Sequence, residues 1–130
     1  MGESISRTSR ALFVLLISFI SLAVFSCSEK KVSFSQEVFP ILKKRCLSCH
    51  YPGNEFNESR LVMTTYELLL KGGVHGSPIV PGKADSSLIV RKLGSDPPFG
   101  RQMPLMSKEK LSSEEIVLIA KWIDQGAKDN

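Results

Sequence analysis

The 130-residue sequence predicts one small domain in which every recognisable element is a helix, preceded by an export segment. The clearest helical signal lies near the C-terminal end, where Ser112 and Glu115 stand at capping-box spacing. A second helical pattern runs from Ser33 into Cys46. Since glycine and proline are frequent between these two stretches, we expect only short helices there.

The pattern before Cys46 contains a proline. Ser33 and Gln36 have capping-box spacing, and Val38 follows at a helical interval. Because proline is best tolerated in the first helical turn, we expect this helix either to begin near Pro40 or to be kinked there.

The C-terminal helix carries an apolar face, which Trp122 and Val117 are expected to widen, and it ends near Gly126. We expect it to pack against the helix that precedes Cys46. Two shorter helices are predicted between them, one from Thr64 or Thr65 to Gly72, and one from Ser86 or Ser87 to Leu93. The apolar face consists of Ile116, Ile119, Ala120 and Ile123.

The five residues Cys46-Leu47-Ser48-Cys49-His50 have the C-x-x-C-H spacing of a c-type haem attachment site. In this pattern, each thiol forms a thioether with a haem vinyl group and the histidine reaches the iron. The sequence therefore predicts one covalent haem c, bound by Cys46, Cys49 and His50.

Four side chains can supply a sixth iron ligand: Met63, His75, Met103 and Met106. Met103 is favoured because it lies beside a proline in an irregular stretch, residues 96–104, which can aim its thioether. His75 and Met106 remain alternatives, and a structural methionine is the ordinary alternative for each Met.

Residues 74–82 form a second loop rich in turn residues. Ile79 and Val80 are candidates to line a haem face, and a backbone fixed by the prolines of this loop can hold a carbonyl toward His50. The alternative is an ordinary loop that packs on the core.

The N-terminal segment has the features of a bacterial lipoprotein signal. Arg7 and Arg10 precede an apolar run over residues 11–25, which is short for a membrane span of about 20 residues. The run ends in a stretch that resembles a lipobox, with Cys27 as the lipid-modified residue. The alternative is an uncleaved signal anchor with Cys27 as a spare thiol.

The predicted organisation is therefore a signal peptide (1–26), a lipidated tether (27–34) and a monohaem cytochrome c domain (35–130). The domain is expected to be exported and lipid-anchored at a bacterial membrane, facing the periplasm or the cell exterior. Attachment of a c-type haem takes place outside the cytoplasmic membrane, which agrees with export.

The net charge and the cysteine content limit the other classes of protein to which this sequence could belong. The formal charge is +4, and removal of the signal peptide with Arg7, Arg10 and Glu3 lowers it to +3, so nucleic acid is not an expected partner. Of three cysteines, one is assigned to lipid and two to haem. A zinc site is hard to assemble since His75 is the remaining histidine, whereas a disulfide between Cys46 and Cys49 stays open.

From about Phe34 onward, the sequence resembles small class I c-type cytochromes, particularly the planctomycete-type cytochrome c domain. The resemblance implies an all-α, class I cytochrome c-like fold with terminal helices packed around one covalently attached haem. It also implies thioethers at Cys46 and Cys49 and axial ligands His50 and Met103. His75 departs from the family pattern. The matching stretches are 38–42, 46–50, 77–82, 87–88, 102–104, 111–112 and 122–127.

This interpretation predicts an electron carrier, not an enzyme. It would pass single electrons between membrane-associated redox proteins and bind no small-molecule substrate. Two alternatives are a haem-based sensor or catalytic subunit with an open sixth site, and a haem-free lipoprotein with a redox or metal-binding C-x-x-C pair.

Overall fold

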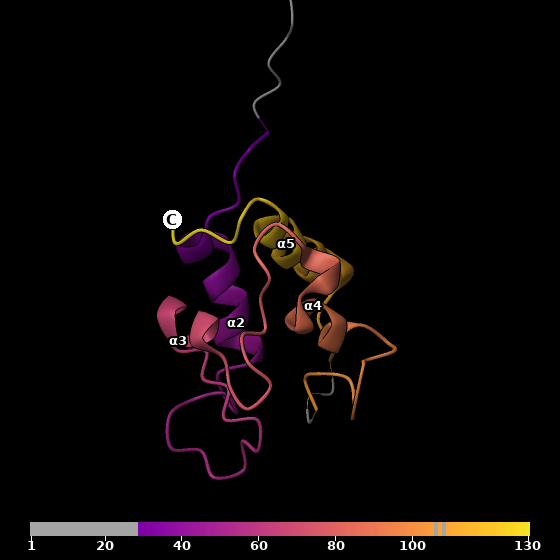
Figure 1. Ribbon diagram of the computed structural model, residues 1–130. Coiled ribbons are helices and arrows are strands. Elements are labelled where there is room, and N and C mark those ends of the chain that lie inside the picture. Colours follow the sequence, from indigo (N-terminus) through magenta and orange to yellow (C-terminus); the bar gives the residue numbers. More distant parts are fainter. Residues whose placement is uncertain (1–28, 106, 108) are drawn as a thin grey trace, which may run out of the picture. The chain divides into compact units, whose positions relative to one another are not determined.

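A computed structural model describes residues 29–105, 107 and 109–130 (Figure 1). The chain divides into two compact units, Met1–Lys30 and Lys31–Asn130, of which the second is the helical domain. The predicted signal peptide, Cys27 and Met106 lie outside the described residues. Within the described part of the chain, no helix is both long and apolar enough to cross a membrane.

The described residues form helices and no strand, as the sequence predicts, and this small helical architecture is consistent with a cytochrome c-like domain. An isolated bridge between Gly73 and Gly76 closes one tight turn. In chain order, the elements are η1 (Phe34–Val38), α2 (Phe39–Arg45), α3 (Tyr66–Lys71), η2 (Ala84–Ser86), α4 (Leu88–Leu93) and α5 (Ser113–Asp124).

The first two elements form one continuous helical segment that begins with a wide turn. The Ser33 side chain accepts a hydrogen bond from the Gln36 amide at 3.2 Å, so the predicted cap is present. The Val38 amide donates to the Ser33 carbonyl at 3.1 Å, which makes η1 a π-helical turn. Pro40 then lies in the first turn of α2, the part of a helix in which proline is best tolerated.

The compact unit begins before residue 35. Val32 and Phe34 are both 5% exposed and belong to the hydrophobic core, so part of the segment expected as a tether packs into the domain. The Val32 amide also donates to the Gln125 side chain at 2.8 Å, which attaches this segment to the end of α5.

Three aromatic rings join the two ends of the domain. The ring centroids of Phe34 and Trp122 are 5.1 Å apart, and those of Phe34 and Tyr66 are 5.3 Å apart. Trp122 is 1% exposed, and its indole N–H donates to the Lys128 carbonyl at 2.8 Å.

The expected packing of α5 against the N-terminal helical segment is confirmed. The expectation for Val117 is wrong, since it is 63% exposed and points away from the core.

The N-terminus of α5 lies beside the C-terminus of α2. Ser112 and Glu115 form the predicted capping box, with Ser112 as the N-cap. The Glu115 carboxylate also accepts a hydrogen bond from Arg45 Nε at 3.2 Å. This interaction holds α5 against the residue that precedes Cys46.

Candidate functional site

The C-x-x-C-H residues form a tight turn at the end of α2. The Cys46 amide donates to the Leu42 carbonyl at 2.8 Å, and the amides of Cys49 and His50 both donate to the Cys46 carbonyl, at 3.1 and 3.0 Å. Cys46 is partly buried, Cys49 is exposed, and both thiols are free. The turn therefore places two cysteine side chains and one imidazole within five residues.

The Cys46 thiol is a weak acid in this position. Burial is the main reason that its pKa rises to about 11, and nearby Cys49 adds to the shift while Arg45 opposes it. The attacking cysteine of a catalytic dithiol has a lowered pKa, because the thiolate is the reacting species. The environment of Cys46 therefore does not favour Cys46 as an attacking thiolate.

His50 is oriented by the backbone. Its Nδ1 lies 3.0 Å from the Leu61 carbonyl oxygen, and its own carbonyl accepts a hydrogen bond from the Met63 amide at 2.9 Å. Because a carbonyl only accepts, Nδ1 carries the proton and the Nε2 lone pair is left to bind a metal.

The sequence left two alternatives for residues 74–82, a proline-fixed carbonyl held toward His50 or an ordinary loop packed on the core. The first alternative is wrong, because the chain reverses after His50 and brings the Leu61 carbonyl alongside the imidazole. In the loop itself, Ile79 is 3% exposed and packs in the core, whereas Val80 is 40% exposed.

The Leu61 carbonyl is itself held in place by the loop of residues 51–60. Asn57 Nδ2 donates to it at 2.7 Å, and the Arg60 amide donates to the Asn57 carbonyl at 2.8 Å. Asn54 Nδ2 donates to the Cys49 carbonyl at 2.6 Å. Sequence reasoning missed both asparagines. Their turn-forming side chains in a loop next to the haem motif are the signal that points to them.

A glycine turn supports the same segment from the other side. The Val74 amide donates to the Ser59 carbonyl at 2.8 Å. Gly73 packs so closely that an added Cβ would lie 2.1 Å from the Ser59 carbonyl oxygen and 2.7 Å from the Leu61 nitrogen. A side chain at residue 73 would therefore displace the backbone that orients His50.

Met103 lies in a separate loop that is attached to α4. Its amide donates to the Lys92 carbonyl at 2.8 Å, and Gln102 Nε2 donates to the Leu93 carbonyl at 2.6 Å. Met103 is partly buried and packs against the core, whereas Met63 is 5% exposed and belongs to it. Met103 thus remains the favoured sixth ligand, and this assignment stays a prediction.

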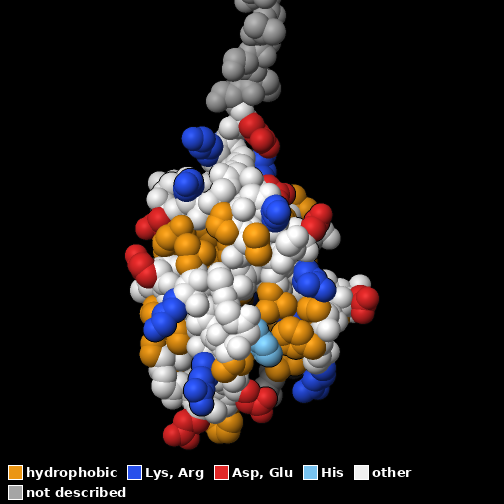
Figure 2. Space-filling model, in the orientation of Figure 1, with side chains coloured by type: hydrophobic (Ala, Val, Ile, Leu, Met, Phe, Trp, Pro, Cys, Tyr) orange, Lys and Arg blue, Asp and Glu red, His pale blue; other side chains and the backbone are white. Residues whose placement is uncertain are grey.

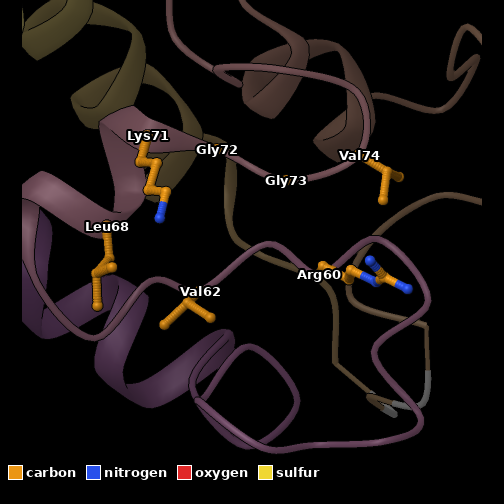
Figure 3. A pocket seen from close by; sticks show the side chains of 7 residues that line it. All are labelled: Arg60, Val62, Leu68, Lys71, Gly72, Gly73 and Val74. Atoms are coloured by element: carbon orange, nitrogen blue, oxygen red, sulfur yellow. The ribbon is translucent and has the colours of Figure 1, made fainter.

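A cavity of about 430 Å³ is lined by α3 residues and by the segments just before and just after α3, within residues 60–74 (Figure 3). In Figure 3, the Lys71 side chain points toward Val62, whereas the Arg60 side chain extends toward Val74, so the two cations do not converge. None of Cys46, Cys49, His50 and Met103 lines this cavity. Among the described residues, no group of three or more His, Cys, Asp or Glu side chains is placed to bind a metal ion.

Residues 46–104 match the sequence model of the family described as Planctomycete cytochrome C. The match begins at Cys46 and includes Cys49, His50 and Met103. A cytochrome c domain implies covalently bound haem c. The residues present fit that group, since two free thiols and an imidazole with an available Nε2 share one turn.

The chain is also similar to a solved structure titled "Kuenenia stuttgartiensis Hydrazine Synthase", at 27% identity and a TM-score of 0.48. The similarity covers 74% of this chain but 16% of that one. No curated protein matches the sequence.

Proposed function

We propose that this protein is a monohaem c-type cytochrome that carries single electrons between redox proteins at a bacterial membrane. The observation that carries the proposal is the hydrogen bond from His50 Nδ1 to the Leu61 carbonyl, beside two free thiols in a cytochrome c segment. This arrangement leaves Nε2 available for iron and fixes the plane of the imidazole ring.

Each residue of the site has a distinct role in this proposal. Cys46 and Cys49 would hold the haem covalently, and His50 and Met103 would bind its iron. When bound, the haem supplies a one-electron ferric/ferrous couple. The Leu61 carbonyl accepts the Nδ1 proton of His50 in a hydrogen bond and so fixes the tautomer of the imidazole, and the Met103 thioether would raise the potential relative to a second histidine.

The partners and location follow from the sequence. The exported domain would be held at the membrane by a lipid on Cys27, facing the periplasm or the cell exterior, and would meet redox proteins at that surface. Electron-transfer encounters use small, transient interfaces, so the protein needs no substrate pocket and is not itself an enzyme.

The experiment that tests this proposal is the visible spectrum of the haem-loaded, full-length protein, compared with Met103→Ala. We expect a c-type reduced spectrum, and a sulfur-to-iron charge-transfer band in the oxidised protein that Met103→Ala abolishes. Met63→Leu is the matched control, since it removes a thioether from the core and should leave the band in place.

Other outcomes would point elsewhere. A band that persists in Met103→Ala would assign the ligand to another sulfur, such as Met106. Strong carbon monoxide binding by the reduced wild type would indicate an open sixth site and a sensor or catalytic role. A protein without haem after expression with a haem-attachment system would refute the proposal.

A further inference from the structure

His75 and Phe99 form a contact between two different loops. Their ring centroids are 4.6 Å apart with an interplanar angle of 41°. His75 is exposed and Phe99 is 43% exposed, so the pair lies at the surface and contributes little to the core. Figure 2 shows histidine atoms beside hydrophobic side chains on the face that is drawn.

The turn that carries His75 is connected to the His50 side of the site. The Val74 amide, next to His75, donates to the Ser59 carbonyl at 2.8 Å, and Gly73 packs on the backbone of the same segment. Two residues further on, the Leu61 carbonyl accepts the His50 hydrogen bond. The position of His75 is therefore set by the segment that orients the proximal ligand.

The loop that carries Phe99 is connected to Met103 through Lys92. The Lys92 ammonium group donates to the Phe99 carbonyl at 2.6 Å and to the Arg101 carbonyl at 2.8 Å. It also lies 4.7 Å from the centroid of the Phe99 ring, which is a cation–π distance. The Lys92 carbonyl accepts the Met103 amide. A displacement of Phe99 would therefore loosen the segment that leads into Met103.

We propose that His75 is a positioning residue that acts through Phe99 to hold the Met103 loop against the segment that orients His50. The proposal rests on the proposed function, in which Met103 is the sixth ligand. Loss of the aromatic contact would raise the population of an open form in which Met103 has left the iron. An aromatic pair of this kind corresponds to about a 2- to 12-fold change in that opening equilibrium.

Imidazole titration of the oxidised, haem-loaded, full-length protein measures this opening. Imidazole replaces Met103 and removes the sulfur band, and its apparent affinity scales with the fraction of open protein. We expect His75→Ala to bind imidazole about 2- to 12-fold more tightly than wild type. His75→Phe retains an aromatic ring and should restore wild-type affinity.

Two controls separate positioning from a general loss of stability. Val74→Ala removes an exposed side chain from the same turn but keeps its backbone hydrogen bond, and should leave imidazole affinity unchanged. In a Phe99→Ala background, His75→Ala should have no further effect, because the partner ring is already absent.

The possible failures are distinguishable. The positioning role is overturned if wild type and His75→Ala bind imidazole with equal affinity. It is also overturned if His75→Ala keeps its full effect in the Phe99→Ala background. Either result leaves the proposed function intact. Absence of the sulfur band from wild type overturns the Met103 assignment, and with it the role of His75.

Discussion

Replacement of Glu115 by glutamine tests the junction between α2 and α5. In the native protein, Glu115 accepts hydrogen bonds from the Ser112 amide at 2.9 Å and from Arg45 Nε at 3.2 Å. The side chains of Arg45 and Glu115 are 16% and 20% exposed, so solvent screens their attraction in part. Glutamine can still accept from Ser112, so Glu115→Gln isolates the contribution of the charge.

The expected loss of unfolding free energy in Glu115→Gln combines two modest effects. A carboxylate at a helix N-terminus contributes about 0.3–1 kcal/mol, and an ion pair of this exposure about 0.2–1 kcal/mol. Glu115→Gln should therefore lower the free energy of unfolding by about 0.5–2 kcal/mol at pH 7. Urea unfolding of the haem-loaded protein measures this difference, with fluorescence of Trp122, the sole tryptophan, as the signal.

The pH dependence follows from the pKa of Glu115. The Ser112 amide is the main cause that lowers this pKa below its ordinary value of 4.5, and Arg45 adds to the effect against opposing burial. A carboxyl group with a lowered folded-state pKa stabilises the protein above its unfolded-state pKa, and this stabilisation disappears as the pH falls through the folded-state value. The difference between wild type and Glu115→Gln should thus be constant above about pH 5.5 and vanish in more acidic solution.

Glu114→Gln is the matched control, because Glu114 lies in the same helical turn but has no contact with Arg45 in the described hydrogen bonds and ion pairs. Its effect should be smaller, and the effect of Glu115→Gln should weaken in 1 M salt. This reasoning would be refuted if wild type and Glu115→Gln had equal unfolding free energies at pH 7. A difference in unfolding free energy that persisted undiminished at pH 3 would also refute it.

Two further substitutions test the site and the core. Gly73→Ala places a methyl group 2.1 Å from the Ser59 carbonyl oxygen. The urea midpoint should therefore fall by the equivalent of about 1–3 kcal/mol or more. An unchanged midpoint would show that this backbone can move freely. Trp122→Ala should cost about 3–5 kcal/mol, followed by far-UV circular dichroism. Trp122→Phe keeps an aromatic ring but loses the hydrogen bond to Lys128, so a loss as large as that of Trp122→Ala would contradict the assigned packing.

The helices of this domain were largely predictable because their signals are local. The capping box of Ser112 and Glu115 sets the start of α5, and the Thr65 side chain caps α3 within a few residues of its own position. Pro40 showed that the first helix is unusual, but the π-helical turn before it depends on how Val32 and Phe34 enter the core. Periodicity could not show that Val117 faces solvent, since a helix with a broad apolar surface buries only the side that meets another element.

The residues of the C-x-x-C-H motif could be predicted from the sequence. The contacts that orient them could not, because those contacts join residues that are far apart in the chain. Cys46, Cys49 and His50 are adjacent in sequence, so their spacing alone identified them. The carbonyl that orients His50 comes from Leu61, and its selection depends on the path of the intervening loop. The contact between His75 and Phe99 joins residues of two loops, and no short sequence pattern encodes such a meeting.

The loop of residues 51–60 is attached at both of its ends and is exposed at its tip. Asn54 and Asn57 attach it to the carbonyls of Cys49 and Leu61, whereas Phe56 between them is 94% exposed. Changes in loop length confined to the tip cost little closure entropy and disturb no core contact. Residues 55–56 are therefore a place where this chain can gain or lose residues, or accept an inserted peptide, while the asparagines preserve the geometry of His50.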